Sequence, residues 1–152
     1  FGRGPHESYW DRKQSAALGV YSGSVWDQTY RYVRPQETGN KTDVFWMAVF
    51  NEKRNGLMAV GLPSFDGSVH RYPYDDLDYY PGAQRHGKLD VVPKDHTDWL
   101  IDLKQMGVGG DNSWGAKPMK KYTIYPGVYN QSMLLIPFTS KADFTKLSKK
   151  RF

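Results

Sequence analysis

The fold is decided by three consecutive segments near the middle of the chain: residues 44–50 (VFWMAVF), residues 51–56 (NEKRNG) and residues 57–62 (LMAVGL). The two outer segments are short and apolar, with β-branched and aromatic side chains that are typical of β-strands. The segment between them is polar and ends in Asn55-Gly56, a pair that tolerates the positive φ angles of a tight reversal. We therefore predict an antiparallel hairpin in which Asn55 and Gly56 make the turn.

Short apolar runs separated by turn residues continue along the whole chain, without sustained helical periodicity. The candidate strands are residues 18–25, 29–33, 44–50, 57–62, 68–72, 88–92, 99–104, 122–125 and 129–138. Pro126-Gly127 separates the last two and predicts a second hairpin. Asp75-Asp76-Leu77 predicts one short helical turn, because Asp caps free backbone N–H groups. The pattern as a whole predicts an all-β protein.

The bulk composition is that of one globular domain, or a fragment of one, spanning residues 1–152. The absence of cysteine excludes disulfides, thiolate metal sites and a cysteine nucleophile. The chain begins without Met, and no apolar run approaches the ~20 residues that a membrane-spanning helix needs. We expect a soluble piece of a longer chain with no membrane association; cytoplasmic and periplasmic locations both stay open.

The net charge of +5 by itself would permit a nucleic-acid partner. Much of the excess lies at the end of the chain, where a basic tail is usually solvated, in Lys146, Lys149, Lys150 and Arg151. No nucleic-acid-binding motif accompanies the charge, so we expect no nucleic-acid partner.

The residue types that hold metal ions show no ligand-like spacing. The four histidines are scattered, without the paired spacing of a zinc site: His6, His70, His86 and His96. The acidic pairs Asp75/Asp76 and Asp90/Asp95 lack the alternating oxygen ligands of a calcium loop. We therefore expect neither a metal site nor a cofactor site in this chain.

The segment richest in functional information is residues 106–115 (MGVGGDNSWG). Its glycines allow backbone paths closed to other residues, and its short polar side chains can bond to the backbone of a loop. The residues that would support this loop are Gly109, Gly110, Asp111, Asn112 and Ser113. The loop would present Trp114, whose indole face suits the C–H-rich face of a sugar ring. The alternative is that Trp114 is a core residue and the glycines only turn the chain.

Residues 106–114 resemble the signature loop in the last domain of the large β-galactosidases of glycoside hydrolase family 2. Two further blocks resemble that family in the same order, residues 2–12 (GRGPHESYWDR) and residues 32–43 (YVRPQETGNKTD). The resemblance extends from residue 1 to about residue 138 and covers the later part of that C-terminal domain. Asn112 departs from the pattern, since many members have a second Asp there; Asn keeps the acceptor and the turn preference but removes a charge.

This resemblance implies an antiparallel β-supersandwich with a galactose mutarotase-like fold. It implies an accessory domain of a larger, homo-oligomeric enzyme whose catalytic centre lies in a separate (β/α)₈ barrel. By motif position, Trp114 would form an apolar platform for the sugar or aglycone beyond the galactose. The Mg and Na ions that this family often uses would be bound elsewhere. A stand-alone carbohydrate-binding module remains the alternative function.

Retaining glycoside hydrolysis needs two carboxyl groups roughly 5–5.5 Å apart. The glutamates of the chain are Glu7, Glu37 and Glu52. Glu52 lies in the predicted hairpin turn, and the other two lie in loop-like blocks where bonding to the backbone is the ordinary role. We therefore expect no catalytic residue in this chain and no hydrolysis by the chain alone.

Overall fold

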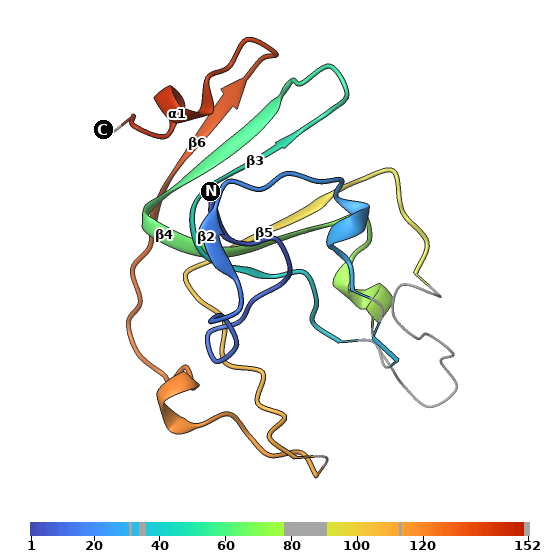
Figure 1. The fold of residues 1–152 in the computed structure, drawn as a ribbon, viewed down its shortest axis with the longest axis vertical. Helices are drawn as coiled ribbons and strands as arrows, with labels where there is room; N and C mark the ends of the chain where they lie inside the picture. Colours follow the sequence, from blue (N-terminus) through green and yellow to red (C-terminus); the bar gives the residue numbers. More distant parts are fainter. Residues whose placement is uncertain (31, 34–35, 78–90, 113, 151–152) are drawn as a thin grey trace.

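An antiparallel four-stranded sheet dominates the computed structural model, which describes residues 1–30, 32–33, 36–77, 91–112 and 114–150 (Figure 1). The strands are β1 (Gly2–Gly4), β2 (Ala17–Gly19), β3 (Lys41–Phe50), β4 (Gly56–His70), β5 (Asp98–Asp102) and β6 (Ser132–Phe138). Short helical segments join or follow them: η1 (Trp26–Gln28), η2 (Tyr74–Leu77), η4 (Lys120–Tyr122) and α1 (Phe144–Leu147). The all-β antiparallel prediction is confirmed, while the galactose mutarotase-like assignment stays a prediction.

The central hairpin forms as the sequence indicates, with β3 and β4 in a register that pairs Trp46 with Val60. Its turn differs from the prediction, because the residue with a positive φ is Arg54 (59°) and neither Asn55 nor Gly56. The Asn51 carbonyl accepts the Arg54 N–H at 2.8 Å, and the Asn51 Oδ1 accepts the Asn55 N–H at 3.1 Å. Asn51 thus closes the turn by accepting hydrogen bonds from Arg54 and Asn55, and Gly56 is the first residue of β4.

The predicted strand 57–62 and residues 68–70 of the predicted strand 68–72 belong to the single long strand β4, whereas residues 71–72 are not in a strand. The first half of β4 pairs with β3 and β6, and its second half pairs with β5 and, at Phe65 and Gly67, again with β3. Pro63 stands between these two sets of partners, where neither register assigns it a partner. Because proline lacks an N–H, it is tolerated where no ladder bond is needed. The strand therefore curves through this point and serves both halves of the sheet (Figure 1).

The predicted second hairpin is wrong. Residues 122–125 form no strand, and β6 pairs with β4 across the sheet, from Leu62 opposite Ser132 to Gly56 opposite Phe138. In this position, Leu134 and Ile136 of β6 pack against the buried side chains of Met58 and Val60. Burial of apolar surface outweighs a local turn signal, because the Pro-Gly pair constrains only its own backbone.

The other strand predictions have mixed outcomes. Of the predicted strand 99–104, residues 99–102 are confirmed as part of β5, and residues 75–77 are confirmed as part of the helical turn η2. Of residues 18–25, only 18 and 19 are in a strand, and the described part of 29–33 has none. Residues 88–90 lie outside the described residues, and residues 91–92 are not in a strand.

The core lies on both faces of the hairpin. Met58 and Val60 are buried with Phe138 on one face, and alternation along β4 places Ala59 on the other, with Val44 and Phe65. Helix α1 covers the first face, where the Phe144 ring lies 5.0 Å from the Phe138 ring. The hairpin is therefore buried on both sides by elements that follow it in sequence.

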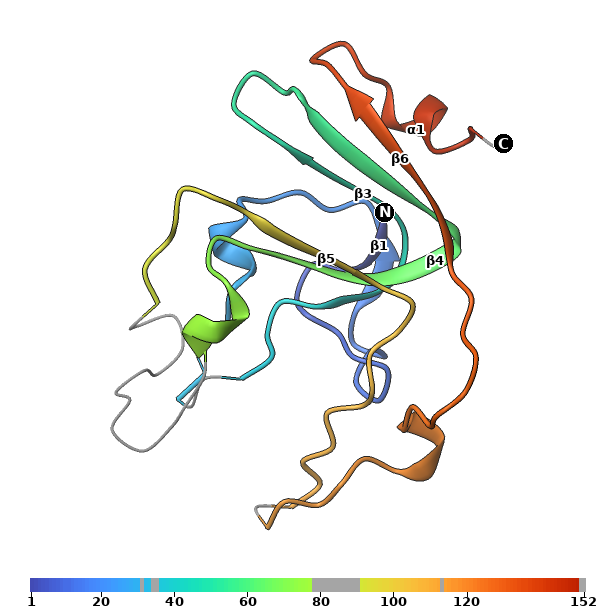
Figure 2. The same cartoon turned by 180° about the vertical axis from the view of Figure 1, so that it is seen from behind.

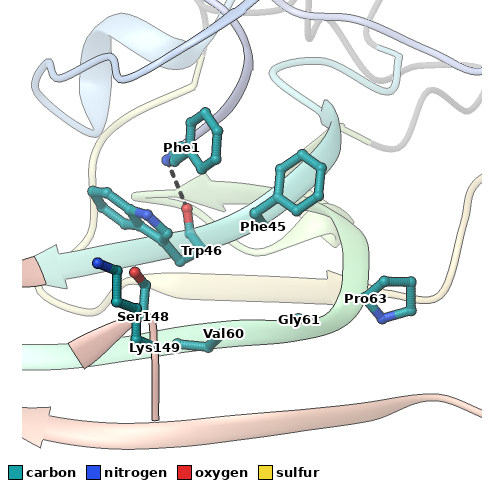
Figure 3. Close-up of a pocket in the computed structure, with 8 residues that line it drawn as sticks. All are labelled: Phe1, Phe45, Trp46, Val60, Gly61, Pro63, Ser148 and Lys149. Carbon is teal, nitrogen blue, oxygen red and sulfur yellow. Dashed lines mark hydrogen bonds between the residues drawn. The ribbon is translucent and has the colours of Figure 1, made fainter. Parts of the chain in front are cut away.

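A cavity of about 230 Å³ lies between the amino terminus and the end of α1 (Figure 3). The Phe1 and Phe45 rings stack on each other at its wall, with their centroids 5.2 Å apart. The Phe1 nitrogen donates a hydrogen bond of 2.8 Å to the Trp46 carbonyl. No helix among the described residues is long and apolar enough to cross a membrane.

Candidate functional site

Trp114 is 91% exposed. It lies in the segment that joins β5 to β6, which extends away from the sheet (Figures 1 and 2). The alternative in which Trp114 is a core residue is therefore wrong. An exposed indole at the end of an extended loop has both faces available for contact with another molecule or module.

The backbone around Trp114 follows the path that the glycines allow. Gly109 and Gly110 have φ angles of 64° and 81°, and a Cβ at Gly109 would lie 2.9 Å from the Ala116 carbonyl oxygen. The Asn112 Oδ1 accepts the Trp114 N–H at 2.8 Å and the Ala116 N–H at 3.3 Å. Asn112 thus closes the turn that presents the indole, as an Asx turn does.

The other two polar residues predicted to support the loop are Asp111 and Ser113. Asp111 is exposed, and its carboxylate makes no hydrogen bond to another described residue. Ser113 lies outside the described residues.

The base of this loop is held by two adjacent residues from the start of the chain. The Asp11 carboxylate accepts the N–H groups of Val108 at 3.1 Å and Gly109 at 2.9 Å. The Arg12 guanidinium donates to the Gly109 carbonyl. Sequence reasoning gave Asp11 no role, because a contact across 98 positions leaves no local pattern.

The first two blocks are joined through Glu7. Its carboxylate accepts hydrogen bonds from the Tyr32 hydroxyl, from the Thr38 hydroxyl at 3.1 Å and from the Gly39 N–H at 2.8 Å. This confirms the expectation that Glu7 bonds to the backbone of a loop. Ser8 adds a second connection, since its N–H donates to the Asn40 carbonyl at 2.8 Å.

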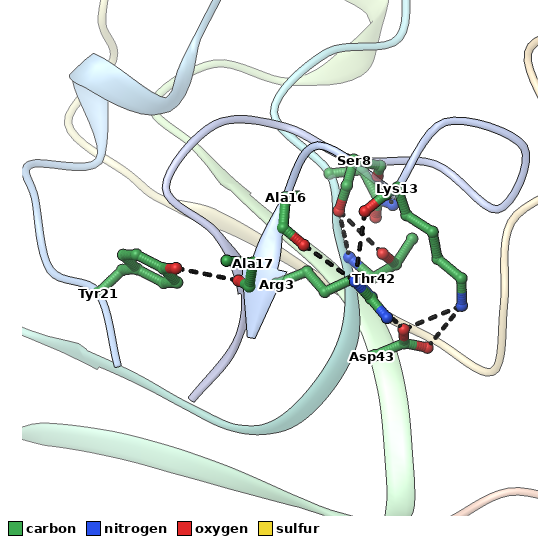
Figure 4. Close-up of polar contacts among 9 residues, drawn as sticks. Arg3, Ser8, Lys13, Ala16, Ala17, Tyr21, Thr42 and Asp43 are labelled. Carbon is green, nitrogen blue, oxygen red and sulfur yellow. Dashed lines mark hydrogen bonds and ion pairs between the residues drawn. The ribbon is translucent and has the colours of Figure 1, made fainter. Parts of the chain in front are cut away.

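The same two blocks are joined again at Asp43, whose φ angle is 51° (Figure 4). Arg3 donates to its carboxylate at 2.5 Å, and the Lys13 ammonium lies 2.9 Å from the same oxygen. Burial alone would raise the pKa of Asp43, but the hydrogen bonds from Arg3 and Lys13 outweigh it and lower that pKa. The ion pairs of Asp43 with Arg3 and Lys13 therefore hold the start of the chain against β3.

The other two glutamates have separate environments. Glu37 accepts a hydrogen bond of 2.5 Å from the Tyr74 hydroxyl, and burial raises its pKa. Glu52 lies exposed in the turn between β3 and β4. Among the described residues, no group of three or more His, Cys, Asp or Glu side chains could hold a metal ion.

A cavity of about 500 Å³ lies where the three blocks meet. Its walls include Glu7 and Arg12 from the first block, Tyr32 from the second and Gly110 from the glycine loop, with Tyr30 beside them. The three blocks, separated along the sequence, therefore meet at one place in the fold. Sequence analysis identified the blocks but not this cavity, because its walls come from segments about 100 residues apart.

Comparison with known proteins places the chain in a defined group. Residues 1–135 match the family described as "Beta galactosidase small chain". A "Beta-galactosidase" of Priestia megaterium is 42% identical over 125 residues, which are 82% of this chain and 12% of that protein. Proteins of the same name from Lactobacillus delbrueckii subsp. bulgaricus and Vibrio cholerae are 34% and 33% identical, over 90% and 89% of this chain. The chain spans 13% and 12% of their lengths.

Proposed function

Since the chain belongs to the beta galactosidase small-chain family, we propose that it is the C-terminal accessory domain of a β-galactosidase, and that Trp114 forms part of the rim of an active site in a separate catalytic barrel. The observation that carries the proposal is the 91% exposure of Trp114 on a loop whose base is tied down. Asp11 and Arg12 hold that base, and Asn112 closes the turn. The exposed ring is thus held in position by the rest of the domain.

The contribution of such a ring is positional. An indole offers apolar contact to the sugar or aglycone next to the galactose, worth about 1–3 kcal/mol when the contact is fully desolvated. Both carboxyl groups of the hydrolysis would belong to the barrel, together with any Mg or Na ions. The domain itself would be a supersandwich of the galactose mutarotase-like kind.

Further apolar side chains are exposed along the same segment between β5 and β6. Five of them are Met119, Ile124, Tyr125, Val128 and Tyr129. Several exposed apolar side chains in one segment are typical of contact with another domain, because exposed apolar area is costly in water. This supports docking of the segment against the rest of a homo-oligomeric parent enzyme, which the domain would stabilise.

Substitution of Trp114 in the parent β-galactosidase tests the proposal. Trp114→Ala should weaken binding of a disaccharide or of a sugar acceptor by about tenfold, and binding of galactose alone by much less. Trp114→Phe should retain part of the affinity, since it keeps an aromatic face. Inhibition constants for galactose and for a disaccharide analogue measure both effects.

The matched control is Leu135→Ala, at an exposed position on β6 away from the glycine loop. It should change neither inhibition constant. Equal losses for galactose and for the disaccharide in Trp114→Ala would contradict the rim position.

A further inference from the structure

The cavity where the three blocks meet is a second site, separate from Trp114, and we propose that it binds a neutral mono- or disaccharide. Its volume of about 500 Å³ falls within the roughly 300–1,000 Å³ of small-molecule sites. This inference does not depend on the role of Trp114, because the exposed indole is not among the residues that line the cavity.

One wall of the cavity is aromatic. Tyr30 is 61% exposed, and its ring lies 4.6 Å from the ring of Tyr32, at an interplanar angle of 57°. The Tyr30 N–H donates a 3.0 Å hydrogen bond to the Thr38 hydroxyl, which itself donates to Glu7. Tyr30 therefore combines a tethered backbone with a largely exposed aromatic side chain, which is what stacking on a sugar ring requires.

The other walls carry groups that bond to hydroxyls. Gln36 lines the cavity with an exposed amide, which both donates and accepts. Arg12 uses part of its guanidinium on the Gly109 carbonyl, and a guanidinium has five N–H donors in total. Ser15 and His6 bond to each other at 3.1 Å at the same cavity. A ligand with several hydroxyl groups matches this mixture of donors and acceptors.

The charges favour a neutral ligand over an anion. Among the described residues that line the cavity, Glu7 and Arg12 are the acidic and basic side chains, and their formal charges cancel. The Glu7 carboxylate is anchored at the wall by three donors, the Tyr32 hydroxyl, the Thr38 hydroxyl and the Gly39 N–H. A phosphate or carboxylate ligand would have to approach that charge, whereas a sugar would not.

The wall is also built before any ligand arrives. Gly39 N–H and the Thr38 hydroxyl hold Glu7, while Asp11 fixes the glycine loop that closes the opposite side. A preorganised site loses little conformational entropy on binding. The tethers described above therefore position a binding cavity as well as the Trp114 loop.

Titration of the full chain with galactose, glucose and lactose, followed by amide chemical shifts, tests the inference. We expect saturable shifts at Tyr30, Tyr32 and Gly110 for at least one of these sugars, and none with inorganic phosphate. Tyr30→Ala should weaken the affinity at least about fivefold, because the stacking face is lost. Gln36→Ala is a second variant at an exposed position, where folding is not at risk, and should weaken it by a smaller factor.

The matched control is Tyr125→Ala, since Tyr125 is 53% exposed and lies outside the cavity. Its affinity should equal that of the parent chain. Absence of saturable binding for all three sugars would overturn the inference, as would full affinity in Tyr30→Ala and Gln36→Ala. Binding that is lost only in Trp114→Ala would overturn it too, and would place the sugar on the indole.

Discussion

The hairpin region and the glycine-loop region of this domain are held together by different forces. In the hairpin region, β3, β4, β6 and α1 surround buried apolar side chains such as Met58, Val60 and Phe138. In the loop region, carboxylates bond to backbone N–H groups far away in sequence, as Asp11 does with Gly109. The first region is a packed core, and the second is a set of loops joined at polar points.

Because of this difference, a substitution in the packed core should have another effect than a substitution at a polar contact of the loops. A cavity in the packed region costs free energy of unfolding throughout the domain, because the sheet unfolds as a unit. Loss of one polar connection loosens the loop that it holds and leaves the sheet intact. The following changes test that contrast, in order of decreasing effect on stability.

The largest effect is expected for Met58→Ala, because Met58 is fully buried against Val60 and Phe138. The lost contacts and the cavity should lower the free energy of unfolding by about 2–5 kcal/mol. Urea denaturation measures this. Met119→Ala removes the same side chain at an exposed position and should change stability by less than about 0.5 kcal/mol. Equal losses in the two variants would remove the distinction between the regions.

The second prediction concerns His70, whose burial should make the stability of the domain depend on pH. Its ring is fully buried between Tyr72 and Tyr74, and neither ring nitrogen has a hydrogen-bond partner among the described residues. Burial, with a smaller contribution from the positive charge of Lys41, lowers the pKa of His70 to about 4. The folded protein therefore resists protonation at a pH where the unfolded chain, with a pKa near 6.5, accepts it.

Stability should consequently be complete above pH 6.5 with respect to His70, and should fall by roughly 3 kcal/mol as the pH drops to about 4. His70→Leu should lose this dependence, as measured by urea denaturation at pH 8 and pH 4. Asp66, whose pKa burial raises to about 6, titrates in the same range but is present in both proteins. Parallel pH curves for the parent chain and the variant would contradict the assignment to His70.

An intermediate and local effect is expected for Asp11→Ala. Two loop N–H groups would lose their acceptor, at a cost of about 1–3 kcal/mol. Hydrogen exchange should show at least about tenfold faster exchange at Val108 and Gly109, with the amides of β3 and β4 unchanged. Asp27→Ala, at an exposed residue whose carboxylate bonds to nearby Ser24, should leave the loop amides unaffected. Uniformly faster exchange over the whole domain would show that the loop and sheet are one unit.

The smallest effect on stability is expected for Trp114→Ala, because the ring is exposed and contributes little buried surface. The free energy of unfolding should change by less than about 0.5 kcal/mol in thermal or urea denaturation. A loss above about 2 kcal/mol would mean that the indole packs against its own domain in solution. Stability without Trp114, together with impaired disaccharide binding in the parent enzyme, would separate a functional ring from a structural one.

Sequence patterns predicted the elements whose signals are local. The alternation of apolar residues on either side of a polar turn predicted the β3–β4 hairpin, and Asp75-Asp76 predicted η2. The pairing of β6 was missed because the chain returns to the sheet after a long excursion, which no local turn signal describes. Helix α1 was missed because its four residues are too few to show helical periodicity.

The residues of the candidate site divide in the same way. By itself, the sequence determined the all-β class, the family resemblance and the loop that presents Trp114, because glycines, Asn112 and an aromatic residue act through adjacent backbone. Only the tertiary structure decided that Asp11 anchors this loop, that Glu7 joins two blocks, and that a cavity opens between them. A carboxylate can accept N–H groups from any segment that folding brings near it, so its partners depend on the path of the whole chain.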